Sequence, residues 1–561
     1  MGRFAIINGP RVRREKEGNS MSVSGAEIMV KCLEKQGVKV LFGYPGAAIC
    51  PFYDALLQSH MHHVLVRQEQ NAGHAASGYA RTSGEVGVCV VTSGPGATNL
   101  ITAIASAYMD SIPIVAITGQ VRSDLLGRDV FQEADITGAC EPFTKHSYLV
   151  KRTADLPRVF KEAFHIASTG RPGPVLIDVP VDIQQNRLDK VGYPDKIDIL
   201  GYKPSVAGHA VQISRAADAI QKAKRPVICA GGGVFSAGAV EALRRLVEQT
   251  SIPCVCTMMG IGALPTAHPL NLGMLGTHGL KGANAAIHGA DLVVLCGARV
   301  GDRAMAAPDQ VAAHAKIIHI DIDPAEIGKN MPATIPIVGD LRLVLEKLCE
   351  TLGVNSVCCP ADWCEACQAG RVPYTRHFST DLVNPKALIR LLSDRLREDS
   401  ILVADVGQNQ IWSANHYQVK KGRFLTSGGM GTMGYSVPAA IGAKMARPDR
   451  QVVAVCGDGS FQMQMMELGT LCQEGLDLKI IVMTNHRLGM VRELQDKGYG
   501  GRQSGVNLAG SPDFIGLAAA YGIPSLRITS DGEAPAAVER LLSTDGPFLL
   551  ECQVDEKEPS L

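Results

Sequence analysis

Short runs of apolar residues recur along this chain, and most of them end in a turn that contains glycine. Clear examples are residues 38–42, 86–92 and 451–456. Segments with the apolar spacing of a helix lie between such runs, for instance 26–36 and 463–474. Continuous apolar runs are typical of strands buried on both faces of a sheet. Their alternation with helices predicts doubly wound parallel sheets.

The order of these segments predicts three domains. We expect them at residues 22–185, 205–350 and 384–553, joined by polar linkers and preceded by an unstructured extension at 1–21. A chain of 561 residues is long enough for three domains of ordinary size. The predicted fold class is therefore α/β, with three doubly wound parallel-sheet domains.

Composition and charge exclude several classes of protein. The chain carries 55 Lys and Arg against 55 Asp and Glu, which argues against a nucleic-acid or membrane-surface partner. No apolar run reaches the length of a membrane-spanning helix. The 16 cysteines, in a chain without a secretory signal, indicate free thiols in a reducing cytoplasm. Cys364 and Cys367, with Cys358 and Cys359 nearby, could suggest zinc, but their spacing favours free thiols.

The strongest chemical signal is a Gly-Asp-Gly-Ser turn at residues 457–460, directly after a predicted buried strand. The next predicted strand, 478–483, is followed by Asn485. Because the carboxyl ends of neighbouring parallel strands share one edge of the sheet, Asp458 and Asn485 can reach a common point. One carboxylate, one amide oxygen and backbone carbonyls suit Mg²⁺, which also takes phosphate oxygens. The alternative interpretation is an ordinary strand-to-helix turn.

This motif resembles the diphosphate- and magnesium-binding motif of thiamine-diphosphate (ThDP) enzymes. The resemblance implies that Asp458, Asn485 and the backbone carbonyl of Arg487 bind Mg²⁺. It also implies that Met433, in a glycine-lined loop at 428–434, is the apolar wedge that holds ThDP bent. The other residues of this part of the chain that the resemblance assigns to ThDP are Gln408, Asn409, Gly431, Thr432, Gly457, Gly459, Ser460, Gly489 and Met490.

Glu69 is predicted to be the catalytic carboxylate. It ends an apolar segment, 64–69, interpreted as a strand, so we expect it to be largely buried, with a pKa suited to sharing a proton with a weak base. An ion pair with Arg67 or Arg81 is the alternative. The sequence around Glu69 and the turn at 93–99 resemble the pyrimidine-binding domain of ThDP enzymes. There the matching glutamate binds the cofactor and protonates its aminopyrimidine ring.

Further segments narrow the resemblance to the catalytic subunit of acetohydroxyacid synthase, also called acetolactate synthase. These segments are 116–120, 131–133, 144–146 and 170–178. The resemblance implies that Phe131 and Gln132 line the substrate channel. It also places Arg303 near the carboxylate of a second 2-keto acid, which a guanidinium fork suits. The alternatives are core packing for Phe131 and an ion pair with Asp302 for Arg303.

The central domain repeats the strand, glycine turn and helix pattern of nucleotide-binding domains. It resembles the domain in which the synthase holds FAD as a structural cofactor, whereas related decarboxylases leave this domain empty or bind ADP. We therefore expect FAD as a third cofactor. The residues implied to contact it are Arg171, Gly232, Thr257, Gly276, His278, Arg299, Asp321 and Asp340.

The resemblance covers residues 22–553 and implies an acetolactate synthase. Pyruvate would lose CO₂, and the remaining unit would join pyruvate or 2-ketobutyrate, at the start of branched-chain amino-acid synthesis. Small 2-keto acids are the expected substrates. Glu69 and Asp458 lie in domains that pair between two chains in this family, so we expect a homodimer or a dimer of dimers. A small regulatory subunit is a further possible partner.

Three departures from the family pattern keep other functions open. Leu494 stands where plant and enterobacterial synthases carry Trp, and Val181 stands where the family often has Lys. The sequence also ends at Leu561, short of the tail that usually folds over the active site. One alternative is another ThDP-dependent carboligase or decarboxylase, acting for example on glyoxylate or sulfoacetaldehyde. A second is a catalytically silent homologue that serves as a binding subunit.

Overall fold

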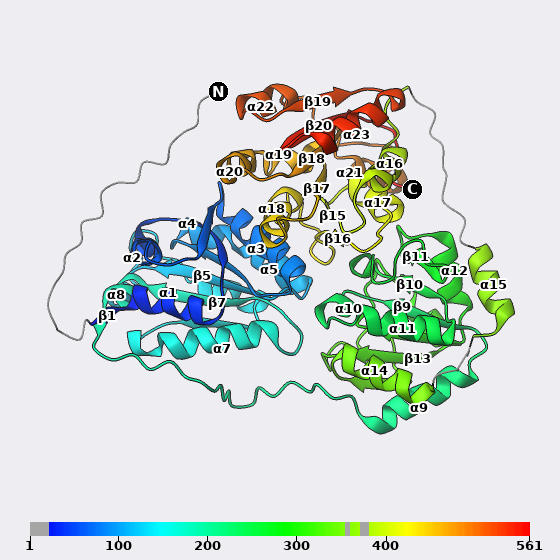
Figure 1. Ribbon diagram of the computed structural model, residues 1–561, viewed down its shortest axis with the longest axis horizontal. Helices are drawn as coiled ribbons and strands as arrows, with labels where there is room; N and C mark the ends of the chain where they lie inside the picture. The colour runs from blue at the N-terminus through cyan, green and yellow to red at the C-terminus, as the bar shows by residue number, and fades with distance from the viewer. Residues whose placement is uncertain (1–21, 354–358, 371–380) are drawn as a thin grey trace.

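The computed structural model describes residues 22–353, 359–370 and 381–561. The expected extension at 1–21 and Cys358 lie outside the described residues. Figure 1 shows three α/β domains, coloured blue to cyan, green, and yellow to red. Each contains a six-stranded parallel sheet with helices on both faces, which confirms the predicted fold class.

The first domain has the strand order β3-β2-β4-β5-β7-β6, and neighbouring strands in it are parallel. Its sheet consists of β2 (Val40–Tyr44), β3 (His62–Leu65), β4 (Gly87–Val91), β5 (Ile114–Gln120), β6 (His146–Leu149) and β7 (Val175–Pro180). Its helices are α1 (Gly25–Lys35), α2 (Cys50–Leu56), α3 (Glu69–Ser83), α4 (Pro95–Asn99), α5 (Ile101–Met109), α6 (Ile136–Cys140), α7 (Leu156–Ser168) and α8 (Val181–Gln185). A small antiparallel pair, β1 (Val23–Ser24) with β8 (Arg187–Leu188), joins the two ends of the domain.

The central domain has the order β11-β10-β9-β12-β13-β14. Its strands are β9 (Pro226–Ala230), β10 (Cys254–Cys256), β11 (Asn271–Met274), β12 (Leu292–Cys296), β13 (Lys316–Asp321) and β14 (Ile335–Val338). Its helices are α9 (Ala210–Lys222), α10 (Gly233–Ser236), α11 (Val240–Thr250), α12 (Lys281–Gly289), α13 (Pro308–Ala312) and α14 (Leu341–Leu352).

The polar linker expected after this domain contains a helix, α15 (Ala361–Ala369). The indole N–H of Trp363 donates to the carbonyl of Pro226 at 3.1 Å, which ties α15 to the central sheet. The described cysteines form no disulfide, and the Cys364 thiol donates to the carbonyl of Ser251. This part of the linker therefore packs as an extension of the central domain.

The third domain has the order β16-β15-β17-β18-β20-β19. Its strands are β15 (Ile401–Ala404), β16 (Arg423–Leu425), β17 (Val452–Gly457), β18 (Lys479–Thr484), β19 (Ser525–Ile528) and β20 (Phe548–Gln553). Its helices are α16 (Pro385–Arg395), α17 (Gln408–His416), α18 (Ser436–Ala446), α19 (Asp458–Gln462), α20 (Leu468–Glu474), α21 (Gly489–Gly498), α22 (Phe514–Ala520) and α23 (Ala534–Ser543).

The segment between β17 and β18 is not the single helix predicted at 463–474. It begins with α19, passes through one 3₁₀ turn, η6 (Met465–Glu467), and ends as α20. At the break, the buried carboxylate of Glu467 accepts the N–H of Arg67 at 2.8 Å and the side-chain amide of Asn71 at 2.7 Å. Contact with the first domain thus accompanies the interruption of the helix.

Helices α3 and α18 join the first and third domains through small residues. A Cβ added to Gly78 would lie 1.9 Å from the carbonyl oxygen of Ala439. A Cβ added to Gly442 would lie 1.8 Å from the carbonyl oxygen of Ala75. Only glycine allows the two backbones to approach so closely. The buried core around this contact contains residues of both domains, so it continues from one sheet to the other.

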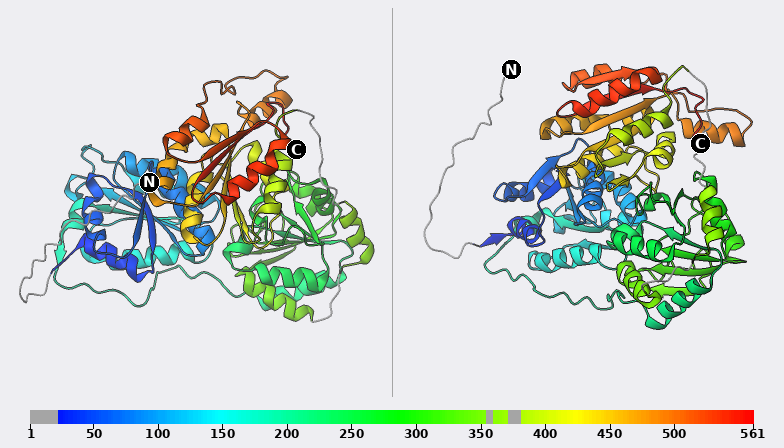
Figure 2. Two further views of the ribbon diagram at one scale, coloured as in Figure 1. Left: turned by 45° about the horizontal axis from the view of Figure 1, so that its top comes forward. Right: turned by 45° about the vertical axis from the view of Figure 1, so that its right-hand side comes forward.

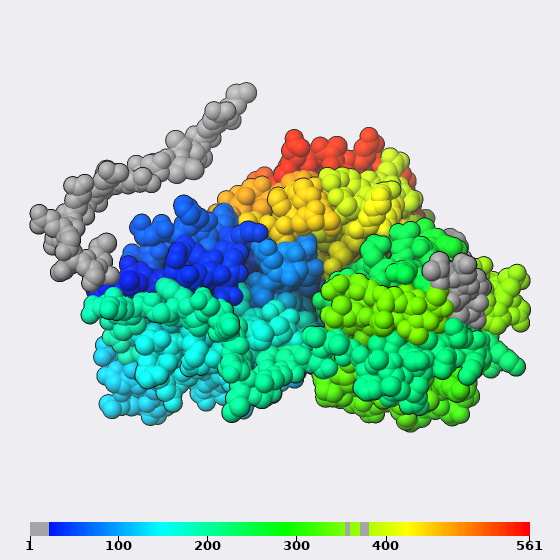
Figure 3. Space-filling model, turned by 60° about the horizontal axis from the view of Figure 1, so that its bottom comes forward, coloured from blue at the N-terminus to red at the C-terminus, as the bar shows by residue number. Residues whose placement is uncertain are grey.

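The three domains pack together, and the chain between the first two runs over the outside. Figure 2 shows this connection in turquoise along the first domain before it enters α9. Tyr202 fastens it, since its hydroxyl accepts from Lys145 Nζ at 3.0 Å and donates to the carbonyl of Thr169 at 2.9 Å. Figure 3 shows the first and central domains meeting along a seam. Among the described residues, no helix is long and apolar enough to cross a membrane.

Candidate active site

The centre of the third sheet brings Asp458 and Asn485 together. Asp458 is the first residue of α19, Asn485 follows β18, and the two preceding strands are neighbours. One carboxylate oxygen of Asp458 accepts the N–H of His486 at 2.7 Å, and the other accepts the N–H of Gly459 at 3.0 Å. His486 has a φ of +55°, an unusual conformation for a residue with a side chain. Strained backbone of this kind often marks a functional turn.

The chemistry of this turn suits a divalent cation. Asp458 is buried, and burial raises its pKa to about 6, although the N–H groups of His486 and Gly459 oppose the rise. A bound cation would favour the ionised carboxylate. No group of three or more His, Cys, Asp or Glu in the described part of the chain could hold a metal. A metal here would therefore also need the amide oxygen of Asn485, the carbonyl of Arg487 and phosphate oxygens, which fits Mg²⁺.

Glycines allow three segments to converge on the same turn. A Cβ added to Gly459 would lie 2.8 Å from Leu488 Cδ2 and 3.7 Å from Met433 Cε. A Cβ added to Gly489 would lie 1.9 Å from Gln408 Oε1. The predicted wedge residue Met433 therefore lies against the turn that carries Asp458. The start of α21 also lies against the start of α17.

Gln408 and Asn409, both predicted to bind ThDP, open α17 and are buried. Asn409 Nδ2 donates to the carbonyls of Asp405 and Val455, which ties the ends of β15 and β17 together. Gln408 Oε1 accepts the side-chain amide of Asn485 at 3.1 Å. Both residues thus stabilise the edge of the sheet on which the predicted metal ligands lie.

The last residues of the chain pack on this edge, which the sequence analysis did not anticipate. Gln408 Nε2 donates to the carbonyl of Glu558 at 2.7 Å, and Ser560 donates to Glu493 through both its N–H and its hydroxyl. Glu556 forms an ion pair with Arg487 at 2.9 Å. The contacts join residues far apart in the sequence, so neither spacing nor composition could reveal them.

Glu69 lies elsewhere than its sequence suggested. β3 ends at Leu65, and Glu69 is the first residue of α3, where the helix dipole favours a carboxylate. It is partly exposed in this chain rather than largely buried. Its carboxylate accepts the side-chain amide of Asn99 at 2.9 Å, beside the turn predicted at 93–99. The expected alternatives do not hold, because Arg67 contacts Leu65 and Gln473 and Arg81 contacts Thr426 and Tyr435.

Phe131 and Gln132 form an exposed turn. Phe131 is 85% exposed, which excludes the core-packing alternative. Gln132 has a φ of +59°, and its backbone lies so close to Gly94 that a Cβ there would be 2.9 Å away. This contact holds the Phe131 turn against the turn at 93–99, next to Glu69. The first domain thus gathers Glu69, Phe131 and Gln132 at one edge.

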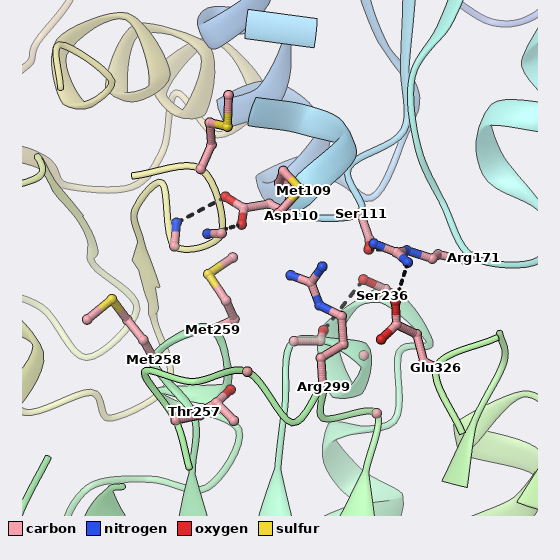
Figure 4. A pocket seen from close by; sticks show the side chains of 18 of the residues that line it. Met109, Asp110, Ser111, Arg171, Ser236, Thr257, Met258, Met259, Arg299 and Glu326 are labelled. Atoms are coloured by element: carbon pink, nitrogen blue, oxygen red, sulfur yellow. Dashed lines mark hydrogen bonds and ion pairs between the residues drawn. The ribbon is translucent and has the colours of Figure 1, made fainter. Parts of the chain in front are cut away.

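A cavity of about 1020 Å³ lies where the three domains meet. Figure 4 shows side chains from the first domain (Asp110, Ser111 and Arg171) facing Thr257, Met259 and Arg299 of the central domain. Of the eight residues predicted to contact FAD, seven line it: Arg171, Gly232, Thr257, His278, Arg299, Asp321 and Asp340. Gly276 lies outside this lining but supports it, since a Cβ there would meet the carbonyl oxygen of Arg303 at 2.1 Å.

The acidic residues that pair with Arg171 were not predicted from the sequence. The guanidinium contacts Glu326 at 2.9 Å and Asp323 at 3.3 Å, and it donates to Ser111 at 2.9 Å. The acidic residues Asp321, Asp323 and Glu326, at the end of β13 and after it, could have indicated these partners. Asp321 ends β13, and burial raises its pKa to about 6. The cavity wall thus combines guanidinium groups with carboxylates.

The cavity continues to Arg303, one of the predicted substrate residues, whereas Phe131 and Gln132 do not line it. Arg303, Met490 and Leu494 line it together with Gly431 of the glycine-lined loop. Arg303 is 74% exposed at its side chain and lies 3.5 Å from Asp302, which is the ion pair expected as the alternative. Such an exposed pair is weak, so the guanidinium remains available to a carboxylate in the cavity.

Comparison with known families defines the class of protein. Residues 23–139 match the N-terminal TPP binding domain of thiamine pyrophosphate enzymes, 213–348 match the central domain and 405–552 match the C-terminal TPP binding domain. The matches cover more than half of the chain. The chain therefore belongs to the thiamine pyrophosphate enzyme family and is a ThDP-dependent enzyme.

Similar proteins narrow this class to acetolactate synthase large subunits. A probable acetolactate synthase large subunit of Methanocaldococcus jannaschii is 47% identical over 548 residues, covering 96% of this chain and 93% of the relative. The large subunit of Corynebacterium glutamicum is 46% identical, covering 95% and 87%. The isozyme 2 large subunit of Escherichia coli is 44% identical, covering 96% of both chains. The chain is a member of this acetolactate synthase group.

Proposed function

We propose that this enzyme is an acetolactate synthase that decarboxylates pyruvate and joins the remaining two-carbon unit to pyruvate or 2-ketobutyrate. The names of its relatives carry the term acetolactate synthase. The reaction would stand at the first common step of branched-chain amino-acid synthesis. The observation that carries the proposal is the continuous cavity. It extends from Met490 and Gly431, both predicted to bind ThDP, past Arg303 to the residues predicted to contact FAD.

ThDP, when bound, would supply the electron sink for decarboxylation and carbon–carbon bond formation. Glu69 would exchange a proton with the aminopyrimidine ring, and Asn99 would hold its carboxylate at the start of α3. Phe131 and Gln132, beside the same turn, would line the way for the keto acid. Arg303 would bind the carboxylate of the second keto acid through its guanidinium fork.

Mg²⁺ would be held by Asp458, Asn485 and the carbonyl of Arg487. The buried Asp458 carboxylate would supply the negative charge, and the diphosphate oxygens would complete the shell. Gly457, Gly459 and Ser460 would let the diphosphate approach the backbone at the start of α19. Gln408 and Asn409 would orient this edge through the contacts described above.

We further propose that FAD occupies the central cavity as a third cofactor. The volume of about 1020 Å³ exceeds that of a small substrate. Arg171 and Arg299 would face its phosphates, while Asp321 and Asp340 offer carboxylates for hydroxyl groups. Purified protein that is yellow and carries a flavin spectrum would support this assignment. Protein that stays colourless after incubation with FAD would contradict it.

The expected partners follow from the domain positions of the site residues. The partners of Glu69 lie in the first domain and those of Asp458 in the third. Because the family resemblance implies that these two domains pair between chains, we propose that two chains complete each site. This gives a homodimer or a dimer of dimers. The term large subunit in the names of the relatives supports a small regulatory subunit as a further partner. A cytoplasmic location is part of the same proposal.

The test is acetolactate formation from pyruvate alone by the purified enzyme with ThDP and Mg²⁺, with and without FAD. We expect product with all three cofactors, and Mg²⁺ removal by a chelator should abolish it. Absence of product from pyruvate, with turnover of glyoxylate or sulfoacetaldehyde instead, would assign the enzyme to another ThDP carboligase. Absence of turnover with any keto acid despite ThDP binding would point to a silent homologue.

A further inference from the structure

The glycine loop, defined here as residues 427–434, is held at both ends by carboxylates that the function described so far does not use. Its sequence, Ser-Gly-Gly-Met-Gly-Thr-Met-Gly, is rich in glycine. Glycine gives the backbone more freedom than any other residue, so a loop of this composition has no preferred conformation of its own. The contacts that impose one therefore decide where Met433 points.

Asp405 holds the carboxyl end of the loop from within the third domain. It follows β15 and is only 1% exposed. One oxygen accepts the N–H of Gly434 at 2.8 Å, and the other accepts the N–H of Ser436 at 2.8 Å. The N–H of Val406 donates at 2.8 Å to the same oxygen as Gly434. These donors compensate for burial, which by itself raises the pKa of Asp405.

Asp110 holds the amino end of the loop from the first domain. It follows α5, and its two oxygens accept the N–H groups of Gly429 at 2.7 Å and Gly428 at 3.1 Å. Figure 4 shows these two bonds across the boundary between the domains. The charges of Arg81 and Arg299 favour the ionised form of Asp110 against the burial that raises its pKa.

A second residue of α5 supports the same end. Ser106 lies one helical turn before Asp110, and its hydroxyl is 3.0 Å from the hydroxyl of Ser427. Ser427 accepts the N–H of Thr432 at 3.1 Å, and the hydroxyl of Thr432 donates to Ser106 at 3.4 Å. Between these anchors the loop is open, and a Cβ on Gly431 would meet nothing within 4 Å. The loop is thus fixed at its ends and through Thr432, and it is open at Gly431.

We propose that Asp110 and Asp405 are positioning residues that clamp the glycine loop from two domains in the conformation that receives ThDP. The inference rests on the proposed assignment of Gly431, Thr432 and Met433 to ThDP. Hydrogen bonds to an ionised carboxylate are stronger than neutral ones, so two bonds at each end can order a flexible loop. Because one anchor lies in the first domain, the shape of the loop depends on how that domain docks.

The test is the affinity for ThDP, measured by calorimetric titration into full-length protein freed of cofactor and supplied with excess Mg²⁺. In Asp110→Asn the side-chain NH₂ faces an N–H donor of the loop. We expect the dissociation constant for ThDP to rise about tenfold, as for the loss of one charge-assisted hydrogen bond. At saturating ThDP the kcat should fall as well, while the KM for pyruvate stays within about twofold because both carboxylate oxygens of Asp110 are bonded to the loop.

Three further variants keep the outcome decisive. Asp362→Asn, on the exposed face of α15, is the matched control and should bind ThDP like the wild type. Ser106→Ala removes one hydroxyl that holds the same end of the loop, and it should weaken ThDP binding about threefold. If Asp110→Asn does not fold, Ser106→Ala serves as the test in its place. Met433→Ala tests the loop assignment itself.

The outcomes distinguish the assignment of the loop to ThDP from the role of its anchors. If Met433→Ala binds ThDP as tightly as the wild type, the proposed assignment of the loop is wrong, and the clamp with it. If Met433→Ala binds weakly while folded Asp110→Asn and Ser106→Ala both match the control, the assignment stands and the clamp is overturned. Weak binding by Met433→Ala, Asp110→Asn and Ser106→Ala, with wild-type binding by the Asp362→Asn control, supports the clamp.

Discussion

Buried carboxylates hold together much of the architecture of this enzyme, and for Asp458 we also propose a role in binding the cofactor. Asp405, Asp458 and Asp178 are each almost fully buried, and burial raises the pKa of each. Each is surrounded by hydrogen-bond donors instead of a paired cation, as expected for buried charge in a folded protein. Glu69 differs, because it is partly exposed at a helix start and would be covered by a second chain.

Replacing Glu69 by Gln should abolish most turnover and leave ThDP binding intact. The amide can still accept from Asn99 but cannot exchange a proton with the aminopyrimidine ring. General acid–base groups contribute about 10²–10⁴-fold, so we expect a loss of at least about a hundredfold in kcat. Acetolactate formation and ThDP titration measure the two properties. Glu141→Gln, an exposed substitution in the same domain, is the control, and equal activity of both variants would remove Glu69 from the mechanism.

Asp178 should make the first domain less stable at neutral pH than at acidic pH. Its pKa is raised from 3.8 to about 7, and Thr118 and Gln120 donate to it at 2.7 and 2.9 Å. The folded state therefore binds the proton more tightly than the unfolded state, and this contribution to stability is lost as the pH rises through about 7. In Asp178→Asn the fall in melting temperature between about pH 5.5 and 8 should be smaller than in the wild type. An unchanged pH dependence would contradict this role.

The helices and strands show which local patterns are reliable. Apolar runs predicted central strands of the first and third sheets to within about two residues, because strands buried on both faces need continuous apolar sequence. The prediction was wrong where packing between domains intervenes. The helix expected at 463–474 is broken where Glu467 meets the first domain, and the strand expected at 64–69 ends at Leu65 so that Glu69 can open α3.

The α3–α18 contact gives a prediction for this interface between domains. Gly442→Ala would place a methyl group about 1.8 Å from the carbonyl of Ala75, so the helices must separate. We expect a loss of about 1–3 kcal/mol in the free energy of unfolding. Urea denaturation measures it. Gly532→Ala, where a Cβ meets nothing within 4 Å, is the matched control. A Gly442→Ala variant as stable as that control would show that the helices can move apart without cost.

The assembled molecule creates features that no single domain contains. The cavity is lined by Arg171 from the first domain, Arg299 from the central domain and Gly429 from the third. The glycine loop is likewise held by Asp405 of its own domain and by Ser106 and Asp110 of the first domain. Binding at either place therefore depends on how the domains dock.

If each active site combines two chains, two inactive variants should restore activity together. Glu69→Gln and Asp458→Ala, co-expressed with different tags, should form mixed dimers in which one site carries both defects and the other carries none. With random pairing, half of the dimers are mixed and half of their sites are intact, so about a quarter of wild-type activity should return. Isolated mixed dimers without activity would show that Glu69 and Asp458 act within one chain.

The amino-acid sequence alone determines most of the buried strands, the α/β fold class with three parallel sheets, and the turn that carries Asp458 and Asn485. These follow from local periodicity and from the rule that parallel strands end at a common edge. The exposure of Glu69, the acidic partners of Arg171, the contact of Glu558 with Gln408 and the two anchors of the glycine loop were decided only by the tertiary structure. Each joins residues far apart along the chain, and spacing carries no information about such contacts until the domains have docked.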